Sequence, residues 1–321
     1  GDRVAIVARN AVAYIETLYA CWWAGLVAVP VNAKLHPREL EFVLGDSGAR
    51  LVFADADWAA ALAAPPPGVR VVALGGADYN RWAHTHEAAP IAARGGDAAA
   101  RLFYTSGTTG RPKGVVISHA NLAAMAASFV RDVEPIVPRD ALLHPAPLSH
   151  GSGLYVVPHV AHGAINVVPE SGGFDAAETV ALMAKFDRAL FFAAPTMVKR
   201  LVESPELARA DLARFKCLVF GGGPMYVADL ESAFAALGPR LAQIYGQGES
   251  PMTITAMDRA AIADAVARGD AARLASVGRA QSGIEIRIGD ADRPCVAGTA
   301  GEVLVRGPTV MLGYFGDADA T

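Results

Sequence analysis

The sequence predicts an α/β fold, in which helices cover a mostly parallel sheet, followed by a short antiparallel β segment. Short apolar runs alternate with helical segments along most of the chain, which is typical of parallel strands joined by helices. The chain has 321 residues, 53% of them hydrophobic, which is enough for a large core and about two structural units. After Ser276 the hydrophobic pattern changes to a period of two, which favours antiparallel β structure.

The first hundred residues supply the alternation. Each expected strand is a short apolar run, the pattern of a strand that is buried on both faces. One amphipathic helix ends at Gly45, and another ends before the prolines at 65–67. Residues 75–98 are polar and weakly patterned, so we expect a loop there. In chain order the strands are Val4–Val7, Val27–Val31, Arg50–Ala54, Val69–Leu74 and Ala100–Tyr104, and the helices are Ala11–Trp23, Arg38–Gly45 and Ala59–Ala64.

The middle of the chain repeats this pattern, and the end departs from it. Buried strands again alternate with helices, and the last strands are joined by glycine-containing turns. We therefore expect an α/β core at residues 1–275 and part of a small antiparallel β-barrel at residues 276–321. The expected helices are Ser118–Ser128, Thr196–Glu203 and Asp229–Leu237, and the expected strands are Ala189–Ala193, Cys217–Phe220, Leu241–Tyr245, Ile284–Ile288 and Glu302–Arg306.

The segment from Tyr104 to Gly114 is the most informative part of the chain. It reads Tyr-Thr-Ser-Gly-Thr-Thr-Gly-Arg-Pro-Lys-Gly. Its glycines let the backbone approach an anion, and its hydroxyls and Lys113 supply neutral and positive donors, so we expect it to wrap a polyphosphate. It lies between an expected strand and an expected helix, where α/β folds bind anions. The glycine spacing is shorter than in the Walker A motif, and the alternative is a polar surface turn.

Composition gives no indication of a nucleic-acid partner, since the net charge is −4. Two stretches without charged residues, Thr17–Ala33 and Ala141–Pro169, contain glycines and prolines and do not predict a membrane span. The cysteines at 21, 217 and 295 are far apart and lack metal-binding spacing, so we expect reduced thiols in a cytoplasmic protein. The pair His159 and His162 has no third ligand nearby, and we expect structural histidines there. The oligomeric state stays open.

Further segments extend the pattern of the 104–114 segment over the whole chain. Together they resemble the adenylate-forming (AMP-dependent synthetase/ligase) superfamily, most closely its fatty-acid and aryl-acid CoA ligases. The resemblance implies two mostly parallel, helix-covered sheets as two subdomains between which the chain crosses. The segments are Gly25–Asn32, Pro147–Gly153, Gly221–Pro224, Tyr245–Ser250 and Gly301–Gly307, continuing to Gly313 and Tyr314.

The resemblance implies a reaction and its small molecules. ATP would activate a carboxylic acid to an acyl-adenylate with release of pyrophosphate, and CoA, as co-substrate, would then take the acyl group as a thioester. Because little covalent work falls to the protein in such a reaction, positioning and charge stabilisation dominate. Mg²⁺ would assist, held by a carboxylate and by phosphate oxygens.

The resemblance also implies roles for single residues on the nucleotide side. Lys113, Glu249 and Thr105 would be catalytic, with Glu249 and Thr105 also at the metal. The alternatives are a solvated surface acid for Glu249 and a core tyrosine for Tyr245. The predicted nucleotide-binding residues are Thr105, Ser106, Gly107, Thr108, Thr109, Gly110, Lys113, Gly221, Gly222, Gly223, Pro224, Tyr245, Gly246, Gln247, Gly248 and Glu249.

On the acid side, the predicted substrate-binding residues are His150, Gly222, Gly246 and Met252. The family often has a hydroxyl residue where this chain has Gly248, which puts one contact with the α-phosphate in doubt. Acetate-specific relatives carry tryptophan at the position of Gly246, so the acid tunnel should be open, and Gly246→Trp should restrict it.

No acidic residue lies between Asp140 and Glu170, which disfavours an amino-acid substrate, because a buried ammonium needs a partner. With Ala193 and Ala194 completing an apolar wall, a fatty or aromatic acid is expected.

Family members continue with a ribose-binding aspartate and a small mobile C-terminal domain that carries a lysine for adenylation. We expect this chain to be a truncated form that lacks that domain. Alone, it should bind ATP weakly and turn over poorly. Transfer to a carrier protein instead of CoA, and a non-catalytic nucleotide-binding role for this fragment, are the alternatives.

Overall fold

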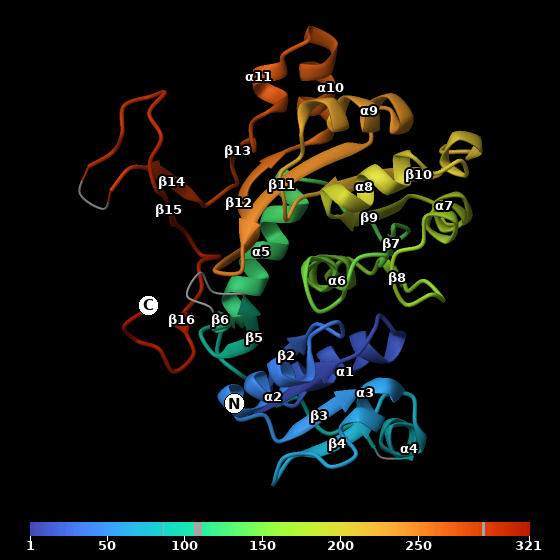
Figure 1. Ribbon diagram of the computed structural model, residues 1–321, viewed down its shortest axis with the longest axis vertical. Coiled ribbons are helices and arrows are strands. Elements are labelled where there is room, and N and C mark those ends of the chain that lie inside the picture. The colour runs from blue at the N-terminus through green and yellow to red at the C-terminus, as the bar shows by residue number, and fades with distance from the viewer. Residues whose placement is uncertain (86, 106–110, 291–292) are drawn as a thin grey trace.

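The computed structural model describes residues 1–85, 87–105, 111–290 and 293–321. Within these ranges the first sheet has seven strands in the order β16-β6-β5-β2-β1-β3-β4 (Figure 1). Strands β1 to β5 run parallel to one another, whereas β6 is antiparallel to both β5 and β16. The strands are β1 (Arg3–Val7), β2 (Val27–Val31), β3 (Leu51–Ala54), β4 (Arg70–Ala73), β5 (Ala99–Thr105), β6 (Lys113–Ser118) and β16 (Gly313–Tyr314).

The second sheet also has seven strands within the described ranges, in the order β13-β12-β11-β10-β9-β7-β8. Strands β7 to β11 pair in parallel, and β12 and β13 extend the sheet by antiparallel pairing. The prediction of two mostly parallel sheets is therefore confirmed. The strands are β7 (Ala141–Leu143), β8 (Ile165–Val167), β9 (Ala189–Ala193), β10 (Phe215–Phe220), β11 (Leu241–Gln247), β12 (Ser250–Met257) and β13 (Arg279–Ala280).

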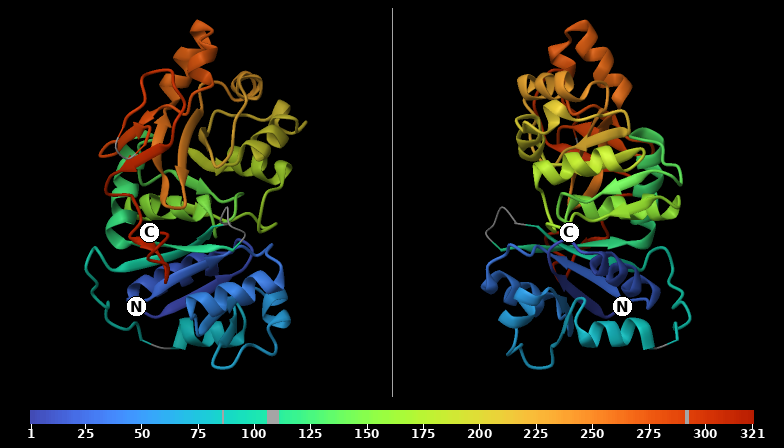
Figure 2. Two further views of the ribbon diagram at one scale, coloured as in Figure 1. Left: turned by 60° about the vertical axis from the view of Figure 1, so that its left-hand side comes forward. Right: turned by 90° about the vertical axis from the view of Figure 1, so that its right-hand side faces the viewer.

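A small antiparallel sheet follows, made of β14 (Glu285–Ile288) and β15 (Val303–Arg306). This confirms the antiparallel segment that the period of two predicts. Beyond it, β16 returns to the first sheet and pairs with β6, so that Gly313 lies opposite Val116. The C-terminal end thus lies beside the first sheet and not beside the small sheet of β14 and β15 (Figures 1 and 2).

Helices cover both sheets, and some of them lie between the sheets (Figure 1). The described helices are α1 (Val12–Trp23), α2 (Pro37–Ser47), α3 (Ala56–Ala61), α4 (Ala77–Thr85), α5 (His119–Asp132), α6 (Gly151–Ala161), α7 (Ala176–Lys185), α8 (Pro195–Val202), α9 (Val227–Leu237), α10 (Arg259–Arg268), α11 (Ala271–Leu274) and the 3₁₀ turn η1 (Leu207–Arg209).

Alternating side chains of the second sheet enter two different cores. Leu190 and Phe192 of β9 pack with α5 and α6 between the sheets, whereas Phe191 packs with α7 to α9 on the outer face. Both faces are therefore apolar, which is why these strands are continuous hydrophobic runs. The core between the sheets also contains Val115 and Ile117 of β6, so it joins the two sheets into one body.

Two local predictions are wrong. Residues 75–98 are not all loop, because α4 forms there. Its Tyr79 and Trp82, three positions apart, make edge-to-face contacts with Phe53 of β3, and these anchors outweigh the polar composition of the segment. The helix expected from Ser118 is confirmed as α5, but the expectation that the 104–114 segment adjoins its N-terminus is wrong. The ends of that segment belong to the antiparallel strands β5 and β6, and α5 begins only after β6, so the helix N-terminus does not face this loop.

Candidate active site

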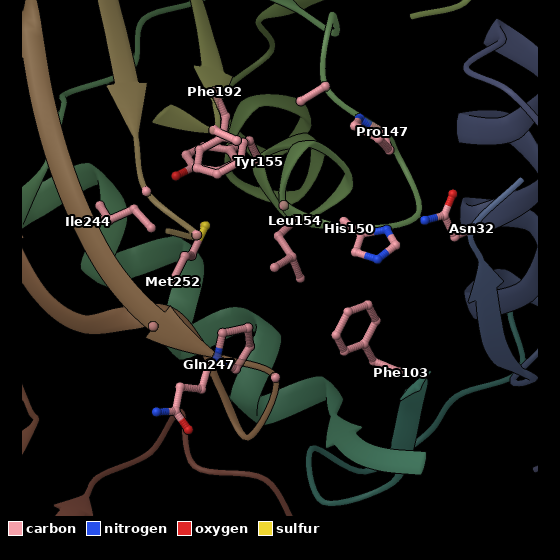
Figure 3. Close-up of a pocket in the computed structure, with 18 of the residues that line it drawn as sticks. Asn32, Phe103, Pro147, His150, Leu154, Tyr155, Phe192, Ile244, Gln247 and Met252 are labelled. Carbon is pink, nitrogen blue, oxygen red and sulfur yellow. The ribbon is translucent and has the colours of Figure 1, made fainter. Parts of the chain in front are cut away.

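A cavity of about 450 Å³ lies between the two sheets, and both contribute to its wall (Figure 3). One part of the wall is apolar, and the other part, next to the first sheet, is polar. Asn32, Arg101 and His150 supply the polar part. The apolar part consists of Leu154 and Tyr155 of α6, Phe192, Met197 of α8, Ile244 and Met252.

Several predicted residues meet at this cavity. His150, Gly222, Gly246 and Met252, the whole predicted acid-binding set, line it. Of the predicted nucleotide segments, Gly221, Gln247 and Gly248 also contribute to its wall. Ala194 lines the cavity as expected, but Ala193 does not. It is buried in the outer core of the second sheet, because successive side chains of a strand point to opposite faces.

The loop between β7 and α6 is fixed by Asn10, which follows β1. The Asn10 amide nitrogen donates to the carbonyls of His144 and Ala146, each at 2.8 Å, and its amide oxygen accepts from the Leu148 N–H at 2.8 Å. Asn10 is buried, so these bonds satisfy backbone groups that water does not reach. One side chain of the first sheet thus positions the start of the segment that ends at His150.

Arg101 of β5 holds the end of the same loop. Its Nη2 donates to the Ser149 carbonyl at 2.7 Å, and its guanidinium lies 5.3 Å from the centre of the Phe103 ring. Burial lowers the pKa of Arg101 to about 10, which leaves it cationic at neutral pH. Sequence reasoning missed Arg101, although a lone arginine inside the apolar run of β5 is a visible signal.

His150 is an electrically neutral ring at the cavity. Burial, and secondarily the charge of Arg101, lower the pKa of His150 to about 4. Its Nδ1 forms a hydrogen bond of 2.8 Å with the Ser149 hydroxyl, and its ring packs edge to face on Phe103 (Figure 3). At neutral pH it therefore offers shape and one ring nitrogen to a ligand, without a charge.

The glycine segments are required by close backbone contacts. A Cβ on Gly221 would lie 2.5 Å from the Ile244 carbonyl oxygen, and a Cβ on Gly246 would lie 2.4 Å from the Met252 amide nitrogen. Met252 itself has a φ of 51°, in the left-handed region that a branched or bulky residue rarely adopts. The cavity floor is thus made of closely packed backbone from β11 and β12.

The described part of the predicted phosphate site lies where β5 and β6 end. Thr105 and Lys113 are cross-strand partners at the ends of β5 and β6. A Cβ on Gly248 would lie 2.6 Å from the Thr105 methyl, so Gly248 passes directly beside that strand end. The predictions for Ser106, Gly107, Thr108, Thr109 and Gly110 lie outside the described residues.

Tyr314 of β16 joins Lys113 to Glu249. The Lys113 ammonium lies 4.9 Å from the centre of the Tyr314 ring, and the Tyr314 hydroxyl donates to Glu249 Oε1 at 2.7 Å. The hydrogen bond with Glu249, then burial, raise the pKa of Tyr314 to about 12. The sequence motif includes Tyr314, but sequence reasoning gave it no role.

Hydrogen bonds hold the chain between β15 and β16 against this site. The Asn121 amide nitrogen donates to the carbonyls of Pro308 and Val310, and the hydroxyls of Ser250 and Thr309 lie 2.9 Å apart. The Met311 N–H donates to the backbone carbonyl of Glu249 at 2.8 Å. These contacts fix Tyr314 next to Glu249.

The remaining predicted residues lie at the edge of the site. The Tyr245 hydroxyl accepts a hydrogen bond of 2.9 Å from the Gln247 side chain, at the end of β11. Gly223 and Pro224 follow β10, are solvent-exposed and do not line the cavity. Their roles as nucleotide-binding residues stay predictions.

Among the described residues, no group of three or more histidine, cysteine, aspartate or glutamate side chains is placed to hold a metal ion. His159 and His162 each bond a helix carbonyl through Nδ1. In the same described ranges, no helix is long and apolar enough to cross a membrane.

A sequence profile of the family described as "AMP-binding enzyme" matches residues 1–315. Feruloyl-CoA synthase from an Amycolatopsis species is 33% identical over all of this chain and 63% of its own length. The fatty acid–[acyl-carrier-protein] ligase ScoC from Streptomyces coeruleorubidus is 31% identical over all of this chain and 62% of its own length. The chain thus spans somewhat less than two thirds of these relatives.

A solved structure shows the same fold. The o-succinylbenzoate CoA synthetase of Bacillus subtilis, in complex with the acyl-adenylate intermediate OSB-AMP, superposes with a TM-score of 0.85 and is 28% identical. The match covers all of this chain and 62% of that one.

Proposed function

The chain belongs to the AMP-binding enzyme family, and we propose that it activates a fatty or aromatic carboxylic acid with ATP. The products are an acyl-adenylate and pyrophosphate, and the full-length protein then forms a thioester with CoA. One observation carries the proposal. A cavity with a largely apolar wall is lined by Gly248, which lies beside Thr105, the cross-strand partner of Lys113, and precedes Glu249. An acid and a polyphosphate would therefore fit side by side.

On the nucleotide side, Lys113 supplies positive charge for the β- and γ-phosphates, and the Thr105 hydroxyl supplies a neutral donor. Both lie at the paired strand ends that flank the 106–110 segment. In this proposal the glycines and hydroxyls of that segment complete the phosphate-binding site. Tyr314 presents an uncharged hydroxyl between them and Glu249, since a phenol is protonated at neutral pH and the raised pKa of Tyr314 moves its ionisation farther from that pH.

Glu249 and Thr105 fit the metal that this reaction uses. One carboxylate and one hydroxyl beside a phosphate site are the oxygen donors that Mg²⁺ accepts together with phosphates, without a dedicated protein cage. When bound, Mg²⁺ would offset the charge of the polyphosphate. The contact between Tyr314 and Glu249 Oε1 orients the carboxylate for that role.

On the acid side, the apolar wall would bury the body of the acid, and neutral His150 would border the acid at the polar part of the wall. No aspartate or glutamate lines the cavity in the part of the chain that the structure describes. An α-ammonium group would therefore have no partner there, which supports a simple acid over an amino acid.

We keep the division into residues 1–275 and 276–321 as part of the proposal, together with a cytoplasmic location. Cys21, Cys217 and Cys295 are free thiols, which supports a reducing compartment. CoA is the first choice of acceptor because the Amycolatopsis relative is a feruloyl-CoA synthase by name. A carrier protein is the second choice, favoured by the ligase ScoC.

A single-turnover experiment tests the proposal. The protein is mixed with Mg²⁺, α-³²P-labelled ATP and a panel of aromatic and fatty acids, and the quench is analysed for acyl-AMP and pyrophosphate. We expect acyl-AMP and pyrophosphate in equal amounts, dependent on the acid. ATP binding without any acid-dependent acyl-AMP would instead support a nucleotide-binding module.

A further inference from the structure

Arg101 is a buried cation at the cavity wall with no acidic partner among the described residues. Only 2% of it is exposed, and no carboxylate lines the cavity with it. Of its five N–H groups, only one at Nη2 has a hydrogen bond within those residues, to the Ser149 carbonyl. A buried charge without a counter-charge is costly, so natural proteins rarely keep one without a use.

A purely structural role accounts for only part of this arrangement. Holding the Ser149 carbonyl needs one donor, which a neutral side chain also supplies. The Phe103 ring, 5.3 Å away, gives a weak cation–π contact and does not neutralise the charge. The remaining guanidinium donors are therefore available to an anion in the cavity.

The position of Arg101 separates it from the predicted phosphate site. Arg101, Phe103 and Thr105 lie on one face of β5, and Thr105 stands at its phosphate end. At about 3.3 Å per residue, Arg101 is about 13 Å farther along the strand. In the proposed function the reacting carboxylate lies by Gly222 and Gly246 of the second sheet, so an anion at Arg101 would be a different group.

We propose that Arg101 is a specificity-determining residue that binds a second anionic group, a carboxylate or sulfonate, at the far end of the acid substrate. The inference rests on the proposed function and narrows its substrate class to acids with two anionic ends. Asn32 and His150 line the same end of the cavity with neutral polar groups, and Figure 3 shows the Asn32 amide nitrogen directed toward His150. A cavity of about 450 Å³ accommodates an aromatic or medium-length aliphatic body between the two ends.

Paired acyl-sulfamoyl adenosines test the inference directly. Each pair carries an ω-carboxyacyl group or its methyl ester on the same chain, in aliphatic lengths from short to medium and with one para-substituted aromatic ring. Calorimetry on the wild-type protein measures both members. We expect at least one pair in which the free carboxylate binds ten-fold or more tightly than its ester. Equal affinity within every pair overturns the inference.

Two variants separate recognition from structure. Arg101→Met should abolish the preference, mainly by weakening the free carboxylate, and Arg101→Lys should retain part of it because the charge remains. If Arg101→Met weakens the acid and the ester equally, Arg101 only holds the Ser149 loop and the inference is wrong. Should Arg101→Met fail to fold, the wild-type comparison decides alone.

Failure of the proposed function has a different signature. In that case no member of any pair binds, and neither does ATP. If esters and free acids bind alike while ATP also binds, the nucleotide site stands and only the role of Arg101 falls.

Discussion

The hydroxyl of Tyr314 donates a hydrogen bond of 2.7 Å to Oε1 of Glu249, across 65 positions of the chain. Glu249 belongs to the turn between β11 and β12 of the second sheet, whereas Tyr314 belongs to the edge strand of the first. The contact therefore ties the two sheets together at the predicted metal ligand. It also brings Tyr314 within 4.9 Å of Lys113, so one side chain touches both predicted phosphate-site charges.

Replacing Tyr314 by phenylalanine should weaken Mg–ATP binding by about three- to ten-fold, since a hydrogen bond to a charged group contributes about 1.5–3 kcal/mol at most and Glu249 remains. Calorimetry with and without Mg²⁺ measures the change. The matched control is Tyr226→Phe, because Tyr226 is 70% exposed and lies outside the cavity wall. Unchanged Mg–ATP affinity in Tyr314→Phe would show that the contact does not orient Glu249.

Asn10→Ala should lower the free energy of unfolding by about 2–4 kcal/mol, because it leaves three buried backbone groups without partners. Denaturation by urea measures the difference. Asn80→Ala removes a single exposed hydrogen bond to Gly75 and should cost less than about 1 kcal/mol. If the two variants lose the same stability, the 144–148 loop does not depend on Asn10.

Gly246→Ala should destabilise the protein by about 1–3 kcal/mol, because the added methyl would meet the Met252 and Ser250 backbone. This corrects the expectation that Gly246→Trp simply shortens the tunnel, since no side chain fits at 246 without moving β12. Gly45→Ala, in open space on α2, should instead be stabilising by about 0.5–1 kcal/mol. Thermal unfolding of both variants checks the contrast, and a neutral Gly246→Ala would contradict it.

Stability should fall as the pH drops from 6.5 toward 4 because of His144. Burial lowers the pKa of His144 to about 4, while its ring bonds Ser152 and Asn166. The unfolded chain takes up this proton near pH 6.5 and the folded protein does not, so acid favours unfolding. The loss should reach about 3 kcal/mol by pH 4.

His144→Gln should remove that share of the pH dependence between 6.5 and 4, whatever it costs at neutral pH. Urea denaturation at several pH values gives the slopes, and the exposed His162→Gln is the control. Parallel curves for wild type and His144→Gln would rule out His144 as a source of acid sensitivity.

Much of the fold was predictable because most of the long buried strands carry a hydrophobic pattern of their own. Continuous apolar runs such as Ala189–Ala193 form strands that are buried on both faces, and the run itself predicts that burial. Helix α4 was not predictable in this way, since its stability comes from aromatic contacts with β3 that lie outside its own sequence. The helix start near Ser118 was predicted correctly, but strand β6 was missed because its short apolar run between the glycine-rich segment and that helix was given no structure.

The site residues also fall into two groups, those that a local sequence motif predicts and those that act through distant parts of the chain. Glycines at 221 and 246 could be predicted from motifs, because close backbone contacts leave no room for another residue. Asn10 and Arg101 could not, since Asn10 acts on carbonyls 134 and 136 residues away and Arg101 on one 48 residues away. Such contacts exist only once the two sheets have met.

The central claim is that Thr105 and Lys113, which flank the 106–110 segment, bind the polyphosphate. Calorimetric titration of Mg–ATP into the wild-type protein, Lys113→Ala and Lys34→Ala tests it. Lys34 is exposed and lies outside the described site. We expect Lys113→Ala to bind at least about ten-fold more weakly, the loss of one charge-assisted contact, while Lys34→Ala binds as the wild type does. Equal affinity of wild type and Lys113→Ala would contradict the account.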